Sequence, residues 1–181
     1  MHKKTFHLVI TLIIAIAFVV QPAQAQGNQP PQFDGTIVGP NGETYYVDEF
    51  FSETKAKQSS LSGFQALAVN CKSATWGVNI YDGVGVLIIR YQQKVDWCYD
   101  GTKITSVSHT KTPTVYRPIY KYNGLIGHIH SGGINQPSYR AYSQASFCMF
   151  APPATACIWY VYPWVDMIVR GNGTVSGSAG Y

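Results

Sequence analysis

The chain has 181 residues, of which 13 are basic and 9 acidic, so only 12% of its side chains are charged. The small and scattered charge excludes a protein that holds nucleic acid or anionic membrane by electrostatic attraction. The length suits a single domain, and a hydrophobic content of 46% is sufficient for one core.

Residues 1–25 predict a secretory signal peptide. Lys3 and Lys4 precede an apolar run from Leu8 to Val20, and Ala23-Gln24-Ala25 forms a small-x-small cleavage site. The run is short for a membrane span and no stop-transfer pattern follows it. We therefore expect a secreted, extracellular protein with a net charge of about +2 and no membrane contact after cleavage.

The segments that follow predict a leader and a hairpin. Residues 26–35 are polar and Pro-rich, as in a flexible leader. Residues 36–60 contain two short strand-like runs around Pro40-Asn41-Gly42, which predicts a hairpin. They continue into a stretch in which Asp48 would cap a short helix and Glu49 would lie in its first turn.

Residues 61–181 have a β texture throughout and predict the main domain. Val, Ile, Thr, Tyr and Trp dominate runs at 64–69, 75–81, 85–93, 95–99, 103–109, 114–122, 125–130, 139–150, 156–162 and 164–170. Turn signals separate many of them: Asp82-Gly83, Asp100-Gly101, Asn123-Gly124, Gly132-Gly133 and Asn172-Gly173. This pattern predicts an all-β fold, an antiparallel β-sandwich of Ig-like or jelly-roll-like type. Asp100-Gly101 and Asn123-Gly124 best fit two-residue hairpin turns.

Four cysteines lie after the signal, and an even number in an exported chain predicts two disulfides. Three pairings are possible. The spacing favours Cys71–Cys98, which flank two strand-like runs, and Cys148–Cys157, which flank the turn signal Pro152-Pro153. On the chain-entropy model, these bridges would contribute roughly 3.6 and 2.7 kcal/mol.

Two histidines, His128 and His130, stand one residue apart in GLIGHIHSGG, and on a strand they would share a face. With His109 as a third ligand from a neighbouring strand, they would form a three-histidine site for Zn²⁺ or Cu²⁺. The parity of Leu125 and Ile129 instead favours a core position for those two side chains and a solvated, outward position for the histidines. We therefore expect no cofactor, with the metal site as the alternative.

Aromatic residues are concentrated in the second half of the chain. Rings on one face of a sheet can stack on sugars or anchor a protein partner, although aromatics are also common as plain strand residues. The candidate ligand-binding residues are Tyr116, Tyr120, Tyr122, Tyr139, Tyr142, Trp159, Tyr160, Tyr162 and Trp164. In a regular strand, Tyr160, Tyr162 and Trp164 share one face and Trp159 takes the other.

No catalytic residue is predicted. The sequence contains no GxSxG elbow, no Gly-rich phosphate loop and no EF-hand loop. Asp96 and Asp100 flank a turn, where carboxylates are more often turn formers than acid–base pairs. An enzymatic role is left open but is not favoured.

One segment resembles a known group of proteins. Trp97, Cys98, Tyr99 and Gly101, followed by Phe147-Cys148, are similar to small secreted β-rich proteins of Gram-positive soil bacteria, over roughly residues 66–170. That group has no established activity. The resemblance implies export, disulfides and a sandwich, and no catalytic or binding residue.

Three functions are consistent with these patterns. The first is a secreted, non-catalytic binding module that holds carbohydrate, or a cell-surface protein, through a Tyr/Trp face. The second is a secreted metal-dependent protein or hydrolase that uses His128 and His130. The third is a structural or antagonistic extracellular protein that self-associates through exposed strand edges.

Overall fold

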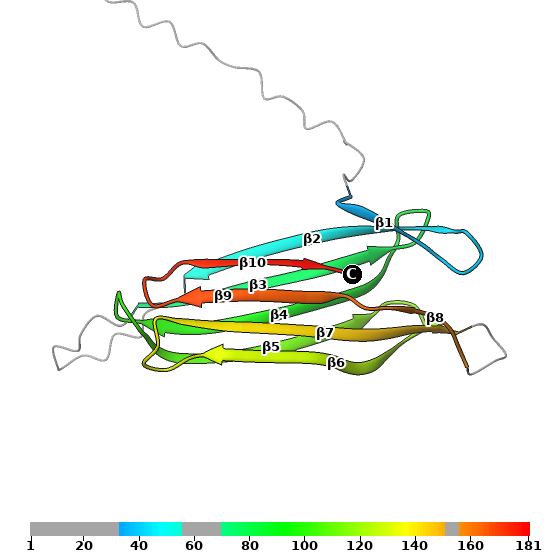
Figure 1. Cartoon of the computed structure of the whole chain (residues 1–181). Coiled ribbons are helices and arrows are strands. Elements are labelled where there is room, and N and C mark those ends of the chain that lie inside the picture. Colours follow the sequence, from blue (N-terminus) through cyan, green and yellow to red (C-terminus); the bar gives the residue numbers. More distant parts are fainter. Residues whose placement is uncertain (1–32, 56–69, 151–155) are drawn as a thin grey trace, which may run out of the picture. The chain divides into compact units, whose positions relative to one another are not determined.

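The computed structural model describes residues 33–55, 70–150 and 156–181. These residues form antiparallel β-strands and no helix, and the strands make two sheets (Figure 1). The predicted all-β sandwich is confirmed. The predicted signal peptide, the leader up to residue 32, the strand at 64–69 and the turn at Pro152-Pro153 lie outside the described residues. Within the three described ranges, no helix has the length and apolarity needed to cross a membrane.

The first sheet contains five strands in chain order, each paired with the next. They are β1 (Gly35–Val38), β2 (Thr44–Lys55), β3 (Asn70–Tyr81), β4 (Leu87–Tyr99) and β5 (Ile104–Val115). The predicted N-terminal hairpin is β1 and β2, with its turn at Gly39–Glu43. Because β2 pairs with β3 over ten residues, this hairpin belongs to the sandwich.

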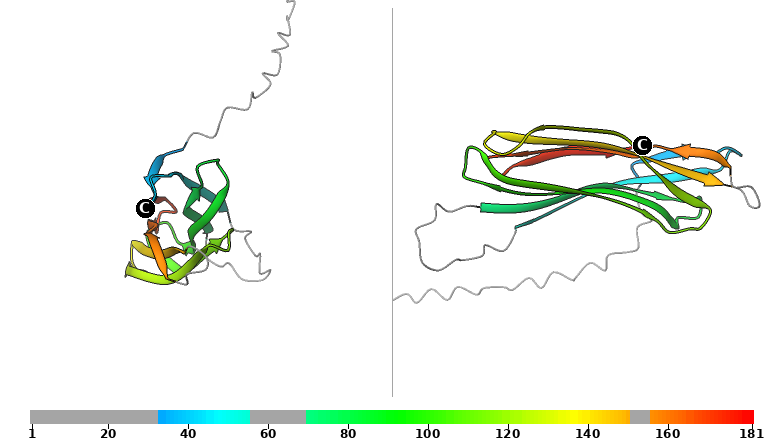
Figure 2. Two further views of the ribbon diagram at one scale, coloured as in Figure 1. Left: turned by 90° about the vertical axis from the view of Figure 1, so that its right-hand side faces the viewer. Right: turned by 90° about the horizontal axis from the view of Figure 1, so that it is seen from below.

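The second sheet has the order β10-β9-β7-β6, and β8 pairs with the far end of β7. Its strands are β6 (Tyr120–Gly132), β7 (Ser138–Phe150), β8 (Cys157–Val161), β9 (Trp164–Arg170) and β10 (Val175–Gly180). Figure 2 shows the two sheets as separate layers. Each sheet is a meander, a simpler order than the Greek keys of Ig-like and jelly-roll sandwiches.

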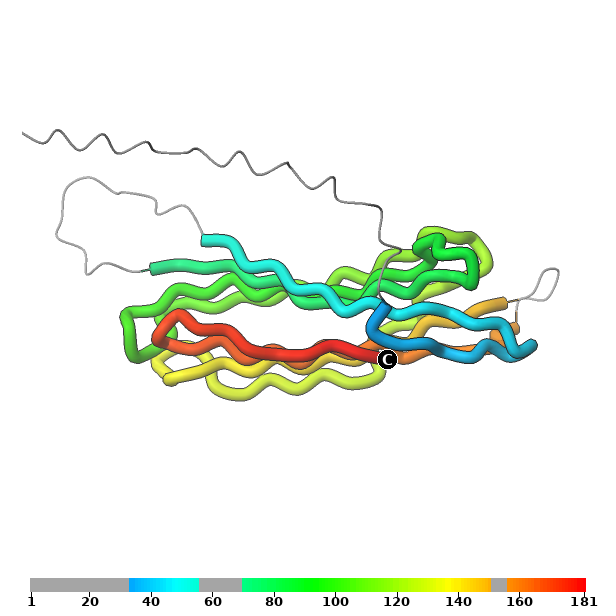
Figure 3. Tube along the Cα trace, turned by 90° about the horizontal axis from the view of Figure 1, so that it is seen from above, coloured from blue at the N-terminus to red at the C-terminus, as the bar shows by residue number. Residues whose placement is uncertain are grey.

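The helix predicted from Asp48 is wrong over the residues that are described, because residues 48–55 belong to strand β2. Pairing with β3 satisfies the backbone of this segment and outweighs a weak helix signal. The Glu49 carboxylate accepts hydrogen bonds from the indole N–H of Trp76 and from the backbone N–H of Ala179, at 2.8 Å for the latter. It therefore links β2 to β10, which run close together in Figure 3.

The two predicted hairpin turns have different outcomes. Asp100 and Gly101 do turn the chain between β4 and β5, but in a four-residue connection in which the Asp100 carboxylate accepts the N–H groups of Thr102 and Lys103 at 2.8 Å. Asn123-Gly124 forms no hairpin. It lies inside β6, where the register with β7 shifts and Gly124 adopts a φ of 118°. Such a conformation suits a glycine at a β-bulge.

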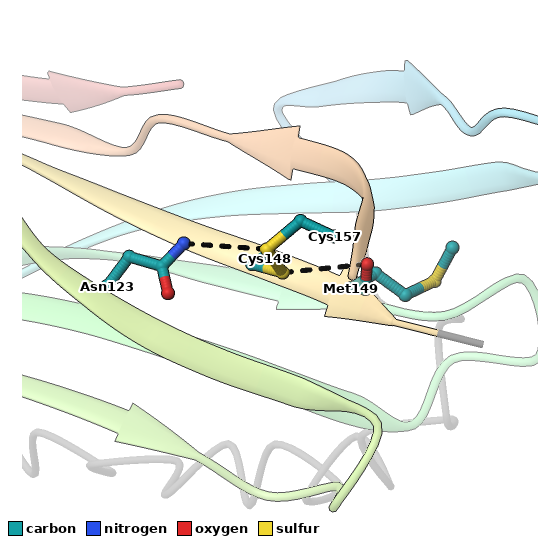
Figure 4. The surroundings of a disulfide bond; sticks show 4 residues. All are labelled: Asn123, Cys148, Met149 and Cys157. Carbon is teal, nitrogen blue, oxygen red and sulfur yellow. Dashed lines mark hydrogen bonds between the residues drawn. A yellow bond between two sulfur atoms is a disulfide. The ribbon is translucent and has the colours of Figure 1, made fainter. Parts of the chain in front are cut away.

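Both predicted disulfides are confirmed. Cys71 and Cys98 lie directly opposite each other on β3 and β4, with their Cα atoms 4.0 Å apart. Cys148 on β7 joins Cys157 at the start of β8, with a Cα–Cα distance of 5.5 Å (Figure 4). The side-chain amide of Asn123 on β6 points at the Cys157 sulfur, 3.8 Å away. Each bridge joins strands that already pair, so it supports the local hairpin.

Two apolar clusters fill the space between the sheets. The larger contains Tyr91 and Phe147, and the smaller contains Trp97 and Met167. Trp76 packs against both. Each cluster takes residues from both sheets, so the burial of apolar surface holds the sandwich together from either end.

A chain of buried hydrogen bonds lies between the two clusters. The Tyr91 hydroxyl donates to Ser143 Oγ at 2.7 Å, and the Ser143 hydroxyl donates to Gln93 Oε1 at 2.7 Å. The Gln93 amide then donates to the Ala141 carbonyl oxygen at 2.9 Å. Since Tyr91 and Gln93 belong to β4 and the other two residues to β7, these bonds cross from one sheet to the other. All three side chains are fully buried.

Replacing Ser143 with alanine is expected to lower the free energy of unfolding by about 1–3 kcal/mol. The substitution removes the acceptor of the Tyr91 hydroxyl and the donor to Gln93 Oε1, which leaves both groups buried and unpaired. Urea unfolding with the disulfides intact measures the change.

The matched control adds Tyr91→Phe and Gln93→Met to Ser143→Ala, which removes the unpaired groups as well. This triple variant is expected to recover much of the lost stability. An unfolding midpoint of Ser143→Ala equal to that of the unaltered protein would show that the buried chain does not matter.

Candidate functional site

Strand alternation divides the nine predicted ligand-binding aromatics into two groups and one outlier. Four side chains point between the sheets, because they pair with or contact core residues: Tyr120, Tyr122, Tyr139 and Trp159. Four point outward from the second sheet: Tyr142, Tyr160 and Trp164 on its strands, and Tyr162, which follows β8 and lies against the Tyr160 ring. Tyr116 lies in the link between β5 and β6 and is 46% exposed.

The inward group takes part in packing. Tyr120 is buried, and its hydroxyl donates to the Tyr45 hydroxyl at 3.5 Å. Burial, followed by the effect of Tyr45, raises the pKa of Tyr120 far above its ordinary value. Trp159 stacks on Tyr45 with ring centroids 4.8 Å apart, and Tyr122 packs against Phe147 at 5.4 Å. These rings pack against core residues between the sheets, so we do not assign them to a ligand-binding surface.

The outward group forms a surface that we call the outer aromatic face, made of Tyr142, Tyr160, Tyr162 and Trp164. Tyr160 and Tyr162 are 44% and 42% exposed, and their rings are nearly parallel, with an angle of 2° and centroids 6.2 Å apart. Tyr142 and Trp164 are half-buried on the same side of the sheet farther along β7, where Trp164 pairs with Gln144 and Tyr142 with Asp166. The sequence parity of Tyr160, Tyr162 and Trp164 agrees with this arrangement.

Polar groups accompany the outer aromatic face. The Gln144 amide donates to the Tyr162 carbonyl oxygen at 3.2 Å, and its oxygen accepts from the Tyr142 hydroxyl at 3.4 Å. Farther along β7, the Arg140 guanidinium forms a two-bond ion pair with Asp166, at 2.6 and 2.9 Å. This face therefore combines flat apolar rings with hydrogen-bonding groups at their margin.

The histidines lie on the other side of the second sheet from where the sequence placed them. His128 and His130 pair with Ser143 and Ala141 of β7, whose side chains are fully buried between the sheets. The predicted outward orientation is therefore wrong, although both side chains are exposed to solvent at this edge of the sheet, as the prediction also stated. Ile129, between the two histidines, is instead the outward residue and is 56% exposed.

The structure brings His109 to the same place. His109 pairs with the buried Val95 and so faces the second sheet from β5. Its ring meets that of His130 edge-on, with centroids 4.3 Å apart, and the His128 and His130 rings are 5.9 Å apart. The Tyr139 hydroxyl hydrogen-bonds to His109 Nδ1 at 2.9 Å. We call this group of three histidines and Tyr139 the histidine seam.

The histidine seam favours neutral imidazoles. Burial lowers the pKa of His109, and Lys111, His130 and His128 lower it further through charge repulsion. Burial also lowers the pKa of His130, together with Lys111 and His128. In the described part of the chain, no three or more His, Cys, Asp or Glu side chains are already arranged to hold a metal ion.

Sequence reasoning missed a cleft at the end of the sandwich, which we call the end cleft. Glu43, Asp82 and Arg117 come from three different connections and meet there above the Tyr45 and Tyr120 rings. These three residues share no sequence motif and no regular spacing, so the sequence contains no signal for the end cleft. Only the packing of the sheets brings their three connections together. The end cleft is open and small, and its walls carry charges of both signs.

No family model, no curated protein and no solved structure matches the chain. The fold and the surfaces described above therefore define only a class, a disulfide-bonded β-sandwich built from two meanders.

Acidification below neutral pH is expected to destabilise the protein through the histidine seam. The pKa values of His109 and His130 are lowered in the folded state, so the unfolded chain takes up protons first as the pH falls. The stabilising contribution is complete above the ordinary histidine pKa of about 6.5 and is lost as the pH falls below it. Urea unfolding from pH 7.5 to 5.0, in buffer with a chelator, measures this slope.

The double variant His109→Gln/His130→Gln is the control for that experiment. In this variant, the free energy of unfolding is expected to change less between pH 7 and 5. The decrease that carboxylate protonation causes at lower pH is expected to remain. Equal slopes for the two proteins would contradict the assignment.

Proposed function

We propose that the protein is an exported, non-catalytic module that binds carbohydrate on its outer aromatic face. The observation that carries this proposal is the exposed, nearly parallel pair of Tyr160 and Tyr162 on the outside of the second sheet. Exposed apolar groups that gather on one surface are often a binding site.

Carbohydrate fits the mixture of groups on this face. A sugar ring has an apolar face of C–H groups that can lie flat on an aromatic ring, and hydroxyls at its edge that need hydrogen bonds. Tyr160 and Tyr162 supply the flat surface, and tyrosine rings lose little conformational entropy on binding. Gln144, whose amide donates to the Tyr162 carbonyl oxygen, supplies a polar group beside Tyr162, and the ion pair of Arg140 with Asp166 lies farther along β7.

The rigidity of the face supports the same function. The β7 and β9 strands that carry Tyr142 and Trp164 are paired residue by residue from Ser138 to Gln144. The disulfide Cys148–Cys157 fastens β8, which carries Tyr160, to β7. Rings on a rigid sheet are ordered before the ligand arrives, so binding costs less entropy.

Export supports an extracellular ligand. The two disulfides suggest an oxidising compartment. Residues 1–25 have the pattern of a secretory signal peptide. Wall or environmental polysaccharides are polymers that such a protein would meet outside the cell.

Tyr160→Ala and Tyr162→Ala are each expected to weaken carbohydrate binding at least tenfold. Neither ring packs in the core, so each variant should keep the circular dichroism spectrum and melting temperature of the unaltered protein. A pull-down with insoluble polysaccharides and a glycan array would find the ligand. Titration calorimetry with the best soluble oligosaccharide would then measure the affinity.

Tyr116→Ala is the matched control, because Tyr116 is equally exposed but lies off the outer aromatic face. Its binding is expected to stay unchanged. Binding that survives in both Tyr160→Ala and Tyr162→Ala but is lost in Arg117→Ala would place the site in the end cleft and overturn the proposal. Binding of a protein partner, with no binding to any glycan, would also overturn the proposal.

A further inference from the structure

We propose that the histidine seam is a binding site for one Zn²⁺ or Cu²⁺ ion, with His109 and His130 as ligands from opposite sheets and His128 as the third ligand. The site is independent of the outer aromatic face, since the two lie on opposite sides of the second sheet. Its role would be to join the two sheets where backbone pairing does not.

The position of the seam is the first argument. β5 is the last strand of the first sheet and β6 is the last strand of the second, and the two do not pair with each other. The backbone bonds between Ile104 and the loop residues Asn135 and Gln136 close this side at one end. His109 and His130 meet farther along the same side, where β5 and β6 are not hydrogen-bonded neighbours in a sheet and a side-chain contact joins the edges.

The distances between the rings are the second argument. Zn²⁺ holds histidine nitrogens at about 2.0–2.1 Å, so two rings bound to one ion must lie within a few ångströms of each other. The His109 and His130 ring centroids are 4.3 Å apart, and those of His128 and His130 are 5.9 Å apart. His128 is exposed on an edge strand, so its ring is free to turn and complete the set.

Tyr139 gives the third argument. It is only 8% exposed, and its hydroxyl holds Nδ1 of His109 at 2.9 Å. With the Nδ1 proton donated to this oxygen, the Nε2 lone pair of His109 is left for an ion. An oxygen partner on the second ring nitrogen is the usual way in which proteins orient a metal-ligating histidine.

The chemistry of the donors selects the class of ion. Three neutral imidazoles suit Zn²⁺ and Cu²⁺, whereas Ca²⁺ and Mg²⁺ require oxygen ligands. Lys111 is two residues from His109 on β5, so it lies on the same face of that strand. Lys111 also makes an anion the competing occupant, and the experiment separates the two.

The test is titration calorimetry of protein expressed from the full-length sequence without a histidine tag and dialysed against EDTA. One Zn²⁺ or Cu²⁺ per chain is expected to bind and to raise the melting temperature, since an ion that binds the folded state stabilises it. His130→Gln and His109→Gln are each expected to weaken binding at least thirtyfold and to abolish the rise in melting temperature. Native mass spectrometry provides the stoichiometry.

Ile129→Gln is the matched control, because it places the same side chain between the two histidines but on the opposite face of β6. It is expected to bind metal as the unaltered protein does. His130 is exposed, so His130→Gln should fold even where His109→Gln, which disturbs the contact with Tyr139, does not.

Three results would overturn the proposal. The first is no binding of either ion at one per chain. The second is binding that survives in His130→Gln, which would mean an adventitious ion only. The third is binding of inorganic phosphate in place of metal, lost in Lys111→Met, which would make the seam an anion site.

Discussion

The hydrogen bonds from Tyr91 through Ser143 to Gln93 set how the two sheets lie against each other. They are polar, buried and lie between two apolar clusters. Apolar packing tolerates small shifts, whereas a buried hydroxyl or amide that loses its partner carries a large cost. β4 is therefore held opposite β7 in one register, and the inward and outward residues of both strands follow from it.

The two sides of the sandwich are closed by different means. On one side, Glu49 of β2 accepts the Ala179 N–H of β10, and the Tyr181 hydroxyl donates to the Thr36 carbonyl oxygen at 2.9 Å. On the other side, β5 and β6 face each other through His109 and His130. The first closure uses a hydrogen bond to a carboxylate and one from a tyrosine hydroxyl, while the second combines the backbone bonds of Ile104 with the packed rings of His109 and His130.

The alternation of side chains along a strand predicted part of the outer aromatic face correctly but gave the wrong orientation for the histidines. The cause is an irregularity within strand β6. In a regular strand, Leu125 and Ile129 would share a face because they are four residues apart. The register of β6 against β7 shifts twice, between Tyr122 and Gly124 and again between Leu125 and Gly127. The second shift puts Leu125 and Ile129 on opposite faces, so His128 and His130 turn inward. No register shift occurs between the pair Tyr160–Cys148 and the pair Trp164–Gln144. Tyr160 and Trp164 therefore both point outward, as the sequence indicates.

The sequence by itself determined the features that depend on neighbours along the chain. These are the β texture, the turns at Asp82-Gly83 and Asn172-Gly173, and both disulfides, since each joins antiparallel strands that pair with each other. Only the tertiary structure decided which side chains point outward and which groups meet. Tyr91 reaches Ser143 and Glu49 reaches Ala179 across 52 and 130 residues. Such contacts follow from how two sheets pack, and this packing depends on the sum of many weak interactions that no local pattern records.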